Sequence, residues 1–307
     1  MRKVWSRLVV HLAACVAALA LPVEGLASQL IWTQWNSIWY SELDGSGMQQ
    51  LISGVQPAYD LRVDDVNGKL YWGDTPYSPG RIMRANLDGS QVETVYTSQP
   101  GSEVLNFALD TANQQIYIAQ PSLNTVSRVG TDGTGYTQLI YSPNANGMEI
   151  DPLAGHIYWT ERFGNYIRRA NLDGTGVQTI FATSWHPGAV DAWTIDLDPA
   201  AGKMYFAGYI PSDGSYHIQV ANLDGTGFQE LLALNGAPWA LRLDPTRSKL
   251  YWAENKSIYR ANVDGTGLEL VLTAPGPIRG IAFGTVPEPA TIGLLIAGGL
   301  ALARRRS

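Results

Sequence analysis

The sequence has a single cysteine, Cys15, among its 307 residues. One thiol cannot form an intramolecular disulfide, and it cannot supply a cysteine-based zinc site. Histidine is almost as scarce, because the four histidines are scattered without the spacing of metal ligands. Folds held together by intramolecular disulfides or by cysteine-ligated zinc are therefore excluded, and the fold must rest on an apolar core.

Charge is also sparse, with 16% charged residues against 45% hydrophobic residues. This composition argues against long-range disorder. The formal net charge of -6 argues against nucleic-acid binding by bulk electrostatics. Phenylalanine is rare beside tyrosine and tryptophan, with 6 Phe against 15 Tyr and 10 Trp. That imbalance indicates a repeated motif that uses Tyr and Trp.

The first 27 residues have the pattern of a secretory signal peptide. A basic start is followed by an apolar run over 8–21, and small residues favour cleavage after Ala27. A lipoprotein signal competes with this interpretation, because the residues around Cys15 also fit a lipobox. Cleavage after Ala27 would leave a mature protein without cysteine.

The last 22 residues, 286–307, have the pattern of a second targeting signal. The motif Pro287, Glu288, Pro289 precedes an apolar stretch over 290–303 and the basic end Arg304, Arg305, Arg306. Fourteen apolar residues fall short of the roughly 20 that span a bilayer comfortably. This order resembles the PEP-CTERM sorting signal of Gram-negative bacteria.

The resemblance implies an exosortase-type enzyme that recognises the tail and removes it. The stretch 290–303 would then enter the inner membrane transiently, and the processed protein would reach the cell surface or extracellular matrix of a Gram-negative bacterium. An ordinary C-terminal membrane anchor is the alternative interpretation.

Between the two signals, residues 28–285 are built from six repeats. A Leu-Asp-Gly turn or a close variant recurs at intervals of 40 to 51 residues, with its Asp at 44, 88, 132, 173, 224 and 264. Each repeat contains four short runs with strand character; in the last they are 240–243, 249–253, 257–262 and 268–272. This period predicts an all-β, six-bladed β-propeller with four-stranded blades.

The ends of the repeat region predict how the ring closes. The region starts at 30–32 with a second strand that lacks a first strand, and it finishes at 279–283 with a first strand that lacks a successor. The C-terminal strand should therefore join the N-terminal blade. That pairing removes two exposed sheet edges.

Three repeats carry the sequences Tyr71-Trp72-Gly73-Asp74, Tyr158-Trp159-Thr160-Glu161 and Tyr251-Trp252-Ala253-Glu254, each with an Asp seven residues before the Tyr. These motifs resemble the YWTD repeats of the low-density-lipoprotein-receptor propeller, over about 30–283. The resemblance implies a six-bladed propeller that binds partners and has neither catalytic activity nor a cofactor. The third and fifth repeats depart from the motif at 118–120 and 206–208, and we expect them to lack its polar contacts.

The Asp residues that recur in the six turns are interpreted as turn formers, because six turns around a ring cannot converge on one calcium ion. Function is expected where repeats differ. In five repeats an Asp lies seven residues before the Tyr. The position two residues before this Asp, with its equivalent in the remaining repeat, forms a ring that should line the central channel. It contains two Ala, together with Arg62, Glu149, Asp196 and Arg242. Two bases and two acids are expected to pair with one another rather than form a catalytic dyad.

A second ring, five residues before that Asp, marks the channel mouth. It contains Tyr59, Leu105, Asn146, Trp193, Trp239 and Arg279. The longest repeat interval adds Trp185 in an extended loop. We predict a binding site formed by Tyr59, Asn146, Trp185, Trp193, Trp239 and Arg279. The alternative is that these aromatic residues cap the core. His186 and Asp191 could form a general-base pair, but no nucleophile accompanies them.

The predicted function is therefore an exported, non-enzymatic propeller for a protein or polysaccharide partner, without nucleic acid. The alternative is a metal-dependent lactonase or lyase with a channel site made of Asn146, Glu149 and Asp196. A third interpretation is a structural matrix component that has no specific ligand.

The sorting signal can be tested by intact mass spectrometry of protein recovered from the outside of the producing cells. We expect the C-terminal arginines, 304–306, to be missing, because the tail is removed after export. Full-length C-termini in that fraction would contradict the sorting prediction.

Overall fold

The computed structural model describes residues 28–74 and 79–287. The predicted signal peptide and most of the predicted sorting tail lie outside the described residues; of the Pro-Glu-Pro motif, only Pro287 is included. No helix in the described part is long and apolar enough to cross a membrane.

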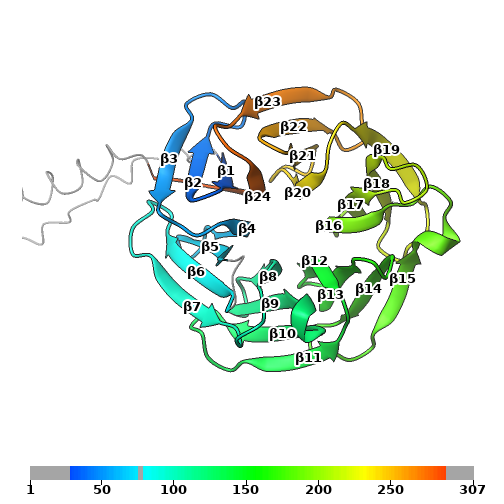
Figure 1. Cartoon of the computed structure of the whole chain (residues 1–307), viewed down its shortest axis with the longest axis horizontal. Helices are drawn as coiled ribbons and strands as arrows, with labels where there is room; N and C mark the ends of the chain where they lie inside the picture. The colour runs from blue at the N-terminus through cyan, green and yellow to red at the C-terminus, as the bar shows by residue number, and fades with distance from the viewer. Residues whose placement is uncertain (1–27, 75–78, 288–307) are drawn as a thin grey trace, which may run out of the picture.

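Six four-stranded antiparallel sheets are arranged radially around a central axis (Figure 1). Blade 1 contains β24 (Ile278–Gly284), β1 (Gln29–Gln34), β2 (Ser37–Ser41) and β3 (Gln49–Ser53). Blade 2 contains β4 (Ala58–Asp64), β5 (Lys69–Asp74), β6 (Arg81–Asn86) and β7 (Glu93–Thr97). Blade 3 contains β8 (Asn106–Asp110), β9 (Gln115–Gln120), β10 (Thr125–Gly130) and β11 (Thr137–Tyr141).

The other half of the ring repeats this order. Blade 4 contains β12 (Ala145–Asp151), β13 (His156–Glu161), β14 (Tyr166–Asn171) and β15 (Gln178–Ala182). Blade 5 contains β16 (Asp191–Asp198), β17 (Lys203–Tyr209), β18 (Tyr216–Asn222) and β19 (Gln229–Leu234). Blade 6 contains β20 (Pro238–Leu243), β21 (Lys249–Glu254), β22 (Ser257–Asn262) and β23 (Glu269–Thr273). The helical elements of the described chain are two 3₁₀ turns, η1 (Pro121–Leu123) and η2 (Thr183–Trp185). The predicted six-bladed propeller is confirmed.

The predicted closure is also confirmed. β24 pairs antiparallel with β1, with Leu30 opposite Phe283 and Trp32 opposite Ile281. The last strand of the propeller is thus the innermost strand of its first blade, and the two ends of the repeat region are held in one sheet.

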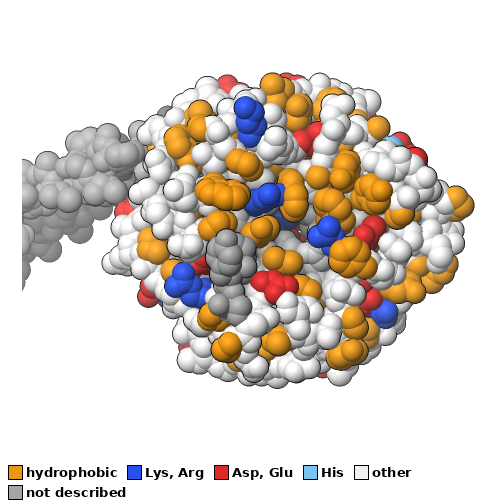
Figure 2. Space-filling view, in the orientation of Figure 1, with side chains coloured by type: hydrophobic (Ala, Val, Ile, Leu, Met, Phe, Trp, Pro, Cys, Tyr) orange, Lys and Arg blue, Asp and Glu red, His pale blue; other side chains and the backbone are white. Residues whose placement is uncertain are grey.

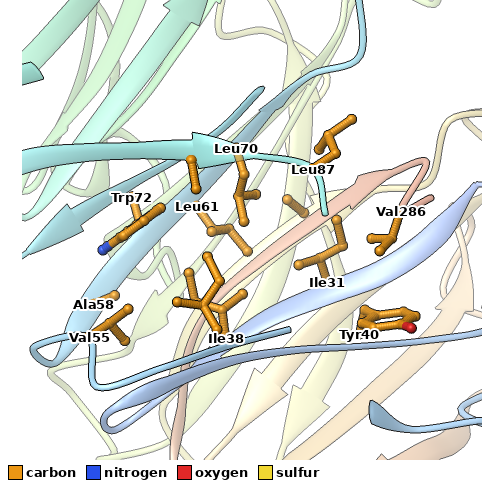
Figure 3. Close-up of a cluster of buried hydrophobic side chains, with 13 residues drawn as sticks. Ile31, Ile38, Tyr40, Val55, Ala58, Leu61, Leu70, Trp72, Leu87 and Val286 are labelled. Carbon is orange, nitrogen blue, oxygen red and sulfur yellow. The ribbon is translucent and has the colours of Figure 1, made fainter. Parts of the chain in front are cut away.

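The Tyr and Trp of the motif pack on opposite faces of their blade, because neighbouring residues in a strand point to opposite faces. Trp72 packs with Ile31 and Leu61 in the cluster between blades 1 and 2 (Figure 3). Tyr71, one residue earlier, packs with Phe107 in the cluster between blades 2 and 3. Each of the six apolar clusters in the described residues spans two adjacent blades in this way.

The repeated turn Asp residues act as turn formers, as predicted. Asp264 Oδ1 accepts hydrogen bonds from the backbone N–H and the hydroxyl of Thr266, at 2.9 and 2.7 Å. The same pattern recurs at the other five turns. The following Gly is required sterically: Gly225 has φ +86°, and a Cβ there would lie 1.7 Å from the Ile180 carbonyl oxygen of the preceding blade.

Blades 3 and 5, which were expected to lack the polar contacts of the motif, make different polar contacts at the same places. Gln120 replaces the acidic residue of the motif in blade 3, and its Oε1 accepts a hydrogen bond from Tyr136 Oη at 3.1 Å. In blade 5, Gly208 leaves no side chain, but Gln219 on the next strand accepts a hydrogen bond from Val190 N–H at 3.0 Å. Other residues therefore supply the contacts that the motif residues do not.

Truncation after Pro275 tests the closure, since it removes β24. Ile278 and Ile281 are fully buried, so their loss alone should lower the free energy of unfolding by roughly 3 to 6 kcal/mol. The measurement is a thermal melt, with a chain ending at Pro287 as the control. Equal melting temperatures would contradict the role of β24.

Candidate functional site at the channel mouth

The antiparallel blades place their connections at two ends of the ring. One end, here called the mouth face, carries the blade-to-blade loops and the turns between second and third strands. The opposite face carries the turns between first and second strands and between third and fourth strands. The predicted mouth positions lie where the innermost strands begin, and therefore on the mouth face.

The structure joins five side chains into a continuous series of aromatic and cation–π contacts, here called the mouth collar: Tyr59, Arg162, Trp193, Trp239 and Arg279. The Arg279 guanidinium lies 3.6 Å from the centre of a Trp239 ring and 5.7 Å from that of Tyr59. The Trp193 and Trp239 rings are 5.9 Å apart. Arg162 lies 4.5 Å from the Trp193 ring. These distances fit cation–π stacking.

The collar surrounds the opening of the channel. Figure 2 shows hydrophobic side chains gathered around the centre of this face, with Lys and Arg side chains between them. A hollow of about 280 Å³ opens there, and it is lined by Tyr59, Leu105, Asn106, Asn146, Arg162, Trp193, Pro238 and Trp239. Asn106 Nδ2 donates a hydrogen bond to Asn146 Oδ1 at 2.9 Å, which fixes the orientation of both amides. Sequence reasoning missed Arg162, because it lies in a turn rather than at an aligned strand position.

Trp185 is not part of the collar. No ring contact within the described chain joins it to Trp193 or Trp239, although its side chain is exposed. Its neighbour His186 stacks on Phe181 and Phe228, with ring centres 4.7 and 4.9 Å apart. The loop therefore packs over the outer strands of its blades.

The suggested pairing of His186 with Asp191 is likewise not formed. The Asp191 carboxylate instead accepts a hydrogen bond from the Phe163 backbone N–H at 3.2 Å. His186 is held by its two aromatic neighbours. A general base oriented by Asp191 is thus absent from this loop.

Below the collar, a largely buried group of charges here called the channel cluster lies along the axis: Asp60, Arg62, Glu149, Asp196 and Arg242. Asp60 Oδ1 accepts hydrogen bonds from Arg62 at 2.8 Å and from Arg242 at 2.7 Å. Arg62 also lies 3.4 Å from Glu149 and donates to the Met148 carbonyl oxygen. The predicted mutual pairing therefore holds for Arg62 with Glu149, whereas Arg242 pairs with an acid that the alignment did not include.

Asp60 lies two residues before Arg62, so alternation along β4 places both side chains on the axial face, but the predicted channel ring included only the Arg62 position. The register shift of β4 against β5 between Ala58 and Leu61 recurs at the equivalent place in β12, β16 and β20. The one sequence signal was that the aligned residues of the other innermost strands, Asn106, Gly147, Thr194, Ala240 and Gly280, carry no charge. Asp60 also accepts the Phe107 backbone N–H at 3.0 Å, which ties blade 2 to blade 3.

Asp196 plays a similar structural part between blades 5 and 6. Its Oδ1 accepts the Leu197 N–H at 2.8 Å, and its Oδ2 accepts the Leu243 N–H at 2.7 Å. Like Asp60, it joins its own innermost strand to the next one. The acidic members of the channel cluster are therefore engaged in holding the ring together.

Burial dominates the electrostatics of the channel cluster. Loss of hydration raises the pKa of Asp60 and of Asp196. The same desolvation raises the pKa of Glu149 to about 7, although the Arg62 guanidinium opposes the shift. Desolvation alone would lower the pKa of Arg62, but Asp60 and Glu149 raise it above its usual value.

The alternative metal site is not assembled from its proposed ligands. Asn146 is bonded to Asn106 at the mouth, Glu149 faces Arg62, and Asp196 is bonded to backbone N–H groups. Within 28–74 and 79–287, no group of three or more His, Cys, Asp or Glu side chains is arranged to hold a metal ion.

The chain is similar to known propellers. It is 33% identical over 126 residues to the human low-density lipoprotein receptor-related protein 5-like protein. The matched region covers 40% of this chain and 47% of the relative. The chain thus spans about half the length of that curated relative. No protein-family profile matches.

Two solved structures share the fold. Nidogen, in a nidogen/laminin complex, matches with a TM-score of 0.71 at 18% identity, over 84% of this chain and 98% of that one. TolB from Acinetobacter baumannii matches with a TM-score of 0.67 at 12% identity, over 86% and 67%. These likenesses establish the fold alone. The local identity to the human relative and the repeated motif support a propeller of the YWTD type.

Glu149→Gln tests the electrostatics of the channel cluster. Because the folded pKa is about 7 and the ordinary value is 4.5, the folded state keeps a proton that the unfolded state loses. The stabilisation that protonated Glu149 gives the folded state is therefore fully present below pH 4.5 and is lost as the pH rises from there to about 7. Above about pH 7 this group no longer changes the stability. The slope can approach about 1.4 kcal/mol per pH unit.

Urea unfolding of the wild type and of Glu149→Gln between pH 5 and about 8 measures this slope. The variant should show a flatter decline over that interval. The control is Glu269→Gln, which removes an exposed acid whose pKa the Arg260 side chain lowers. An unchanged pH profile in Glu149→Gln would rule out the assigned titration.

Proposed function

We propose that this chain is an exported, non-enzymatic propeller that binds a protein partner through its mouth face. Export rests on the two terminal sequence signals, the second of which would be processed by an exosortase-type enzyme at the inner membrane. The binding proposal rests chiefly on one observation, which is the uneven distribution of exposed aromatic side chains over the two faces.

Seven aromatic residues are prominent among the exposed large apolar side chains of the described chain, and six lie on the mouth face. These six are Trp35, Tyr141, Phe163, Tyr166, Trp185 and Trp239. The exposed large residues of the opposite face are aliphatic apart from Tyr136. Aromatic residues gathered on one face are typical of a protein-binding surface.

The mouth collar adds the features of an anchoring site. Trp239 is 37% exposed, and its ring is held in place by Arg279 and Trp193. Trp, Tyr and Arg are the residues that most often dominate binding energy at interfaces. Because the collar is stacked in the free protein, little side-chain entropy remains to be lost on binding.

The similar proteins support a protein as partner. Nidogen is seen in a complex with laminin, and the human relative is named as related to a lipoprotein receptor. These similarities favour a protein over a polysaccharide, and they favour a binding role over an enzymatic one.

Site-specific photo-crosslinking in the producing cells tests the proposal. A photoreactive phenylalanine analogue replaces Trp35, which is 60% exposed on the mouth face, or Leu153, which is 98% exposed on the opposite face. We expect a reproducible adduct with one protein from position 35 only, identified by mass spectrometry. Adducts at 153 alone, or equal adducts at both positions, would refute binding through the mouth face.

Trp239→Ala separates recognition from core capping. Since the Trp239 ring is more than one-third exposed, its loss should cost less than the roughly 3 to 5 kcal/mol of a buried Trp. Affinity for the crosslinked partner should weaken by about 2 kcal/mol or more. A large fall in melting temperature with unchanged affinity would make Trp239 a core cap.

A further inference from the structure

The hollow at the mouth continues outward as a groove across blades 3 and 4. A second hollow of about 340 Å³ shares Leu105, Asn146 and Arg162 with the first. Its outer lining consists of Glu103, Pro121, Ser122, Asn144 and Phe163. The two hollows together form an open radial groove with Arg162 in the middle, which suits an extended chain better than a compact ligand.

The outer wall of the groove is held rigid. Phe163 adopts a left-handed backbone conformation with φ 65°, which is uncommon for a bulky residue. The Phe163 backbone N–H donates a hydrogen bond to the Asp191 carboxylate. The Arg162 guanidinium carbon lies 5.0 Å from the centre of the Phe163 ring. Arg162 therefore lies between two aromatic rings, Phe163 and Trp193, at the point where the hollows meet.

Arg162 and Arg279, in the groove and at its rim, form no ion pair within the described chain, as is also true of Arg128, Arg169 and Arg247, whereas several other arginines are paired. Arg62 and Arg242 pair with Asp60, and Arg260 pairs with Glu269. Arg279 has Nη1 buried without a hydrogen-bond partner, and no acid is among the groups that perturb it. Arg162 has Nε in the same state; Asp191 attracts it through space but makes no ion pair with it. The mouth therefore presents two guanidinium groups that are not held in ion pairs, with Asp191 and Glu103 nearby offsetting part of the Arg162 charge.

The outer end of the groove carries the opposite charge. Glu103 lines it, and the Glu103 carboxylate accepts a hydrogen bond from Ser122 Oγ. A polyuronate has a carboxylate on every unit and would meet Glu103 with like charge. A peptide with a single acidic residue would not, and the amides of Asn144 and Asn146 can bond its backbone. The charge pattern therefore favours a peptide over an acidic glycan.

We propose that the radial groove binds an extended peptide segment of a partner protein and that an acidic side chain of this segment pairs with Arg162, with Arg279 adding its field from the rim. This inference rests on the proposed function, since it names the chemistry of the partner at the mouth. The carboxylate would replace the water around a guanidinium that two rings already hold in place, and so would gain a charge-assisted hydrogen bond at low entropic cost.

A displayed library of random dodecapeptides, selected on the full-length chain, tests the proposal. We expect the enriched peptides to share an acidic residue. One enriched peptide and its acid-to-amide counterpart are then titrated against the wild type, Arg162→Gln, Arg162→Lys and Lys256→Gln by calorimetry. Lys256 is an exposed charge on the mouth face that lines neither hollow, and its variant is the matched control.

The acid-to-amide change should weaken binding to the wild type at least about tenfold. It should have little effect on Arg162→Gln, because the two changes remove the same contact. Arg162→Lys should retain part of the affinity, and Lys256→Gln should bind like the wild type. Enriched peptides without an acid, or an equal loss in the wild type and Arg162→Gln, would overturn the inference. Binding of oligogalacturonate, lost in Arg162→Gln, with no peptide enriched, would overturn it in favour of a glycan.

Trp239→Ala distinguishes a failure of the acidic anchor from a failure of the proposed mouth-face function. If Trp239→Ala abolishes peptide binding while the acid-to-amide change has no effect, the acidic anchor is wrong and the mouth-face function stands. If the enriched peptides bind Trp239→Ala and Arg162→Gln as well as they bind the wild type, both fail.

Discussion

The structure depends on the alternation of side chains along the second strand of each blade. Adjacent residues in that strand must face opposite neighbours, so a Tyr-Trp pair seals both sides of one blade at once. Tyr117 meets Trp159 between blades 3 and 4, and Tyr205 meets Trp252 between blades 5 and 6. Every blade thus needs two neighbours. A closed ring gives each blade two neighbours, and the pairing of β24 with β1 joins the two ends of the repeat region in one sheet and so holds the ring closed.

Repetition explains why so much was predictable from the sequence. Because the ring maps aligned positions onto neighbouring places, the shared position of Trp193 and Trp239 implied their contact, and the structure has their rings 5.9 Å apart. The same logic placed Arg279 beside them, with its guanidinium over Trp239. The departures in blades 3 and 5 were harder to interpret, since Gln120 makes a different contact from the acidic position of the motif and Gln219 makes one from the next strand, outside the motif.

Alignment misses residues whose role has no counterpart in the other repeats. Asp60 lies on the same strand face as Arg62, but the aligned residues of the other repeats carry no charge, so its contact with Arg242 could not be inferred from the repeat. Arg162 lies in a turn, and no other repeat has a counterpart that points to its role. Trp185 shows the reverse error: loop length indicated a place at the mouth, but aromatic stacking of His186 on Phe181 and Phe228 fixes that loop over the outer strands. In all three cases the decisive contacts belong to one repeat and are not shared by the others.

The two layers of charge along the axis have different chemistry. In the channel cluster, burial makes unpaired charges costly, so Asp60 is shared between Arg62 and Arg242 from blades 2 and 6. At the mouth, the cations are orientated by aromatic rings instead of by acids. An aromatic ring fixes the direction of a guanidinium without neutralising it. The collar can therefore be rigid in the free protein and still keep its capacity to bind an anion, which an internal ion pair would have used up.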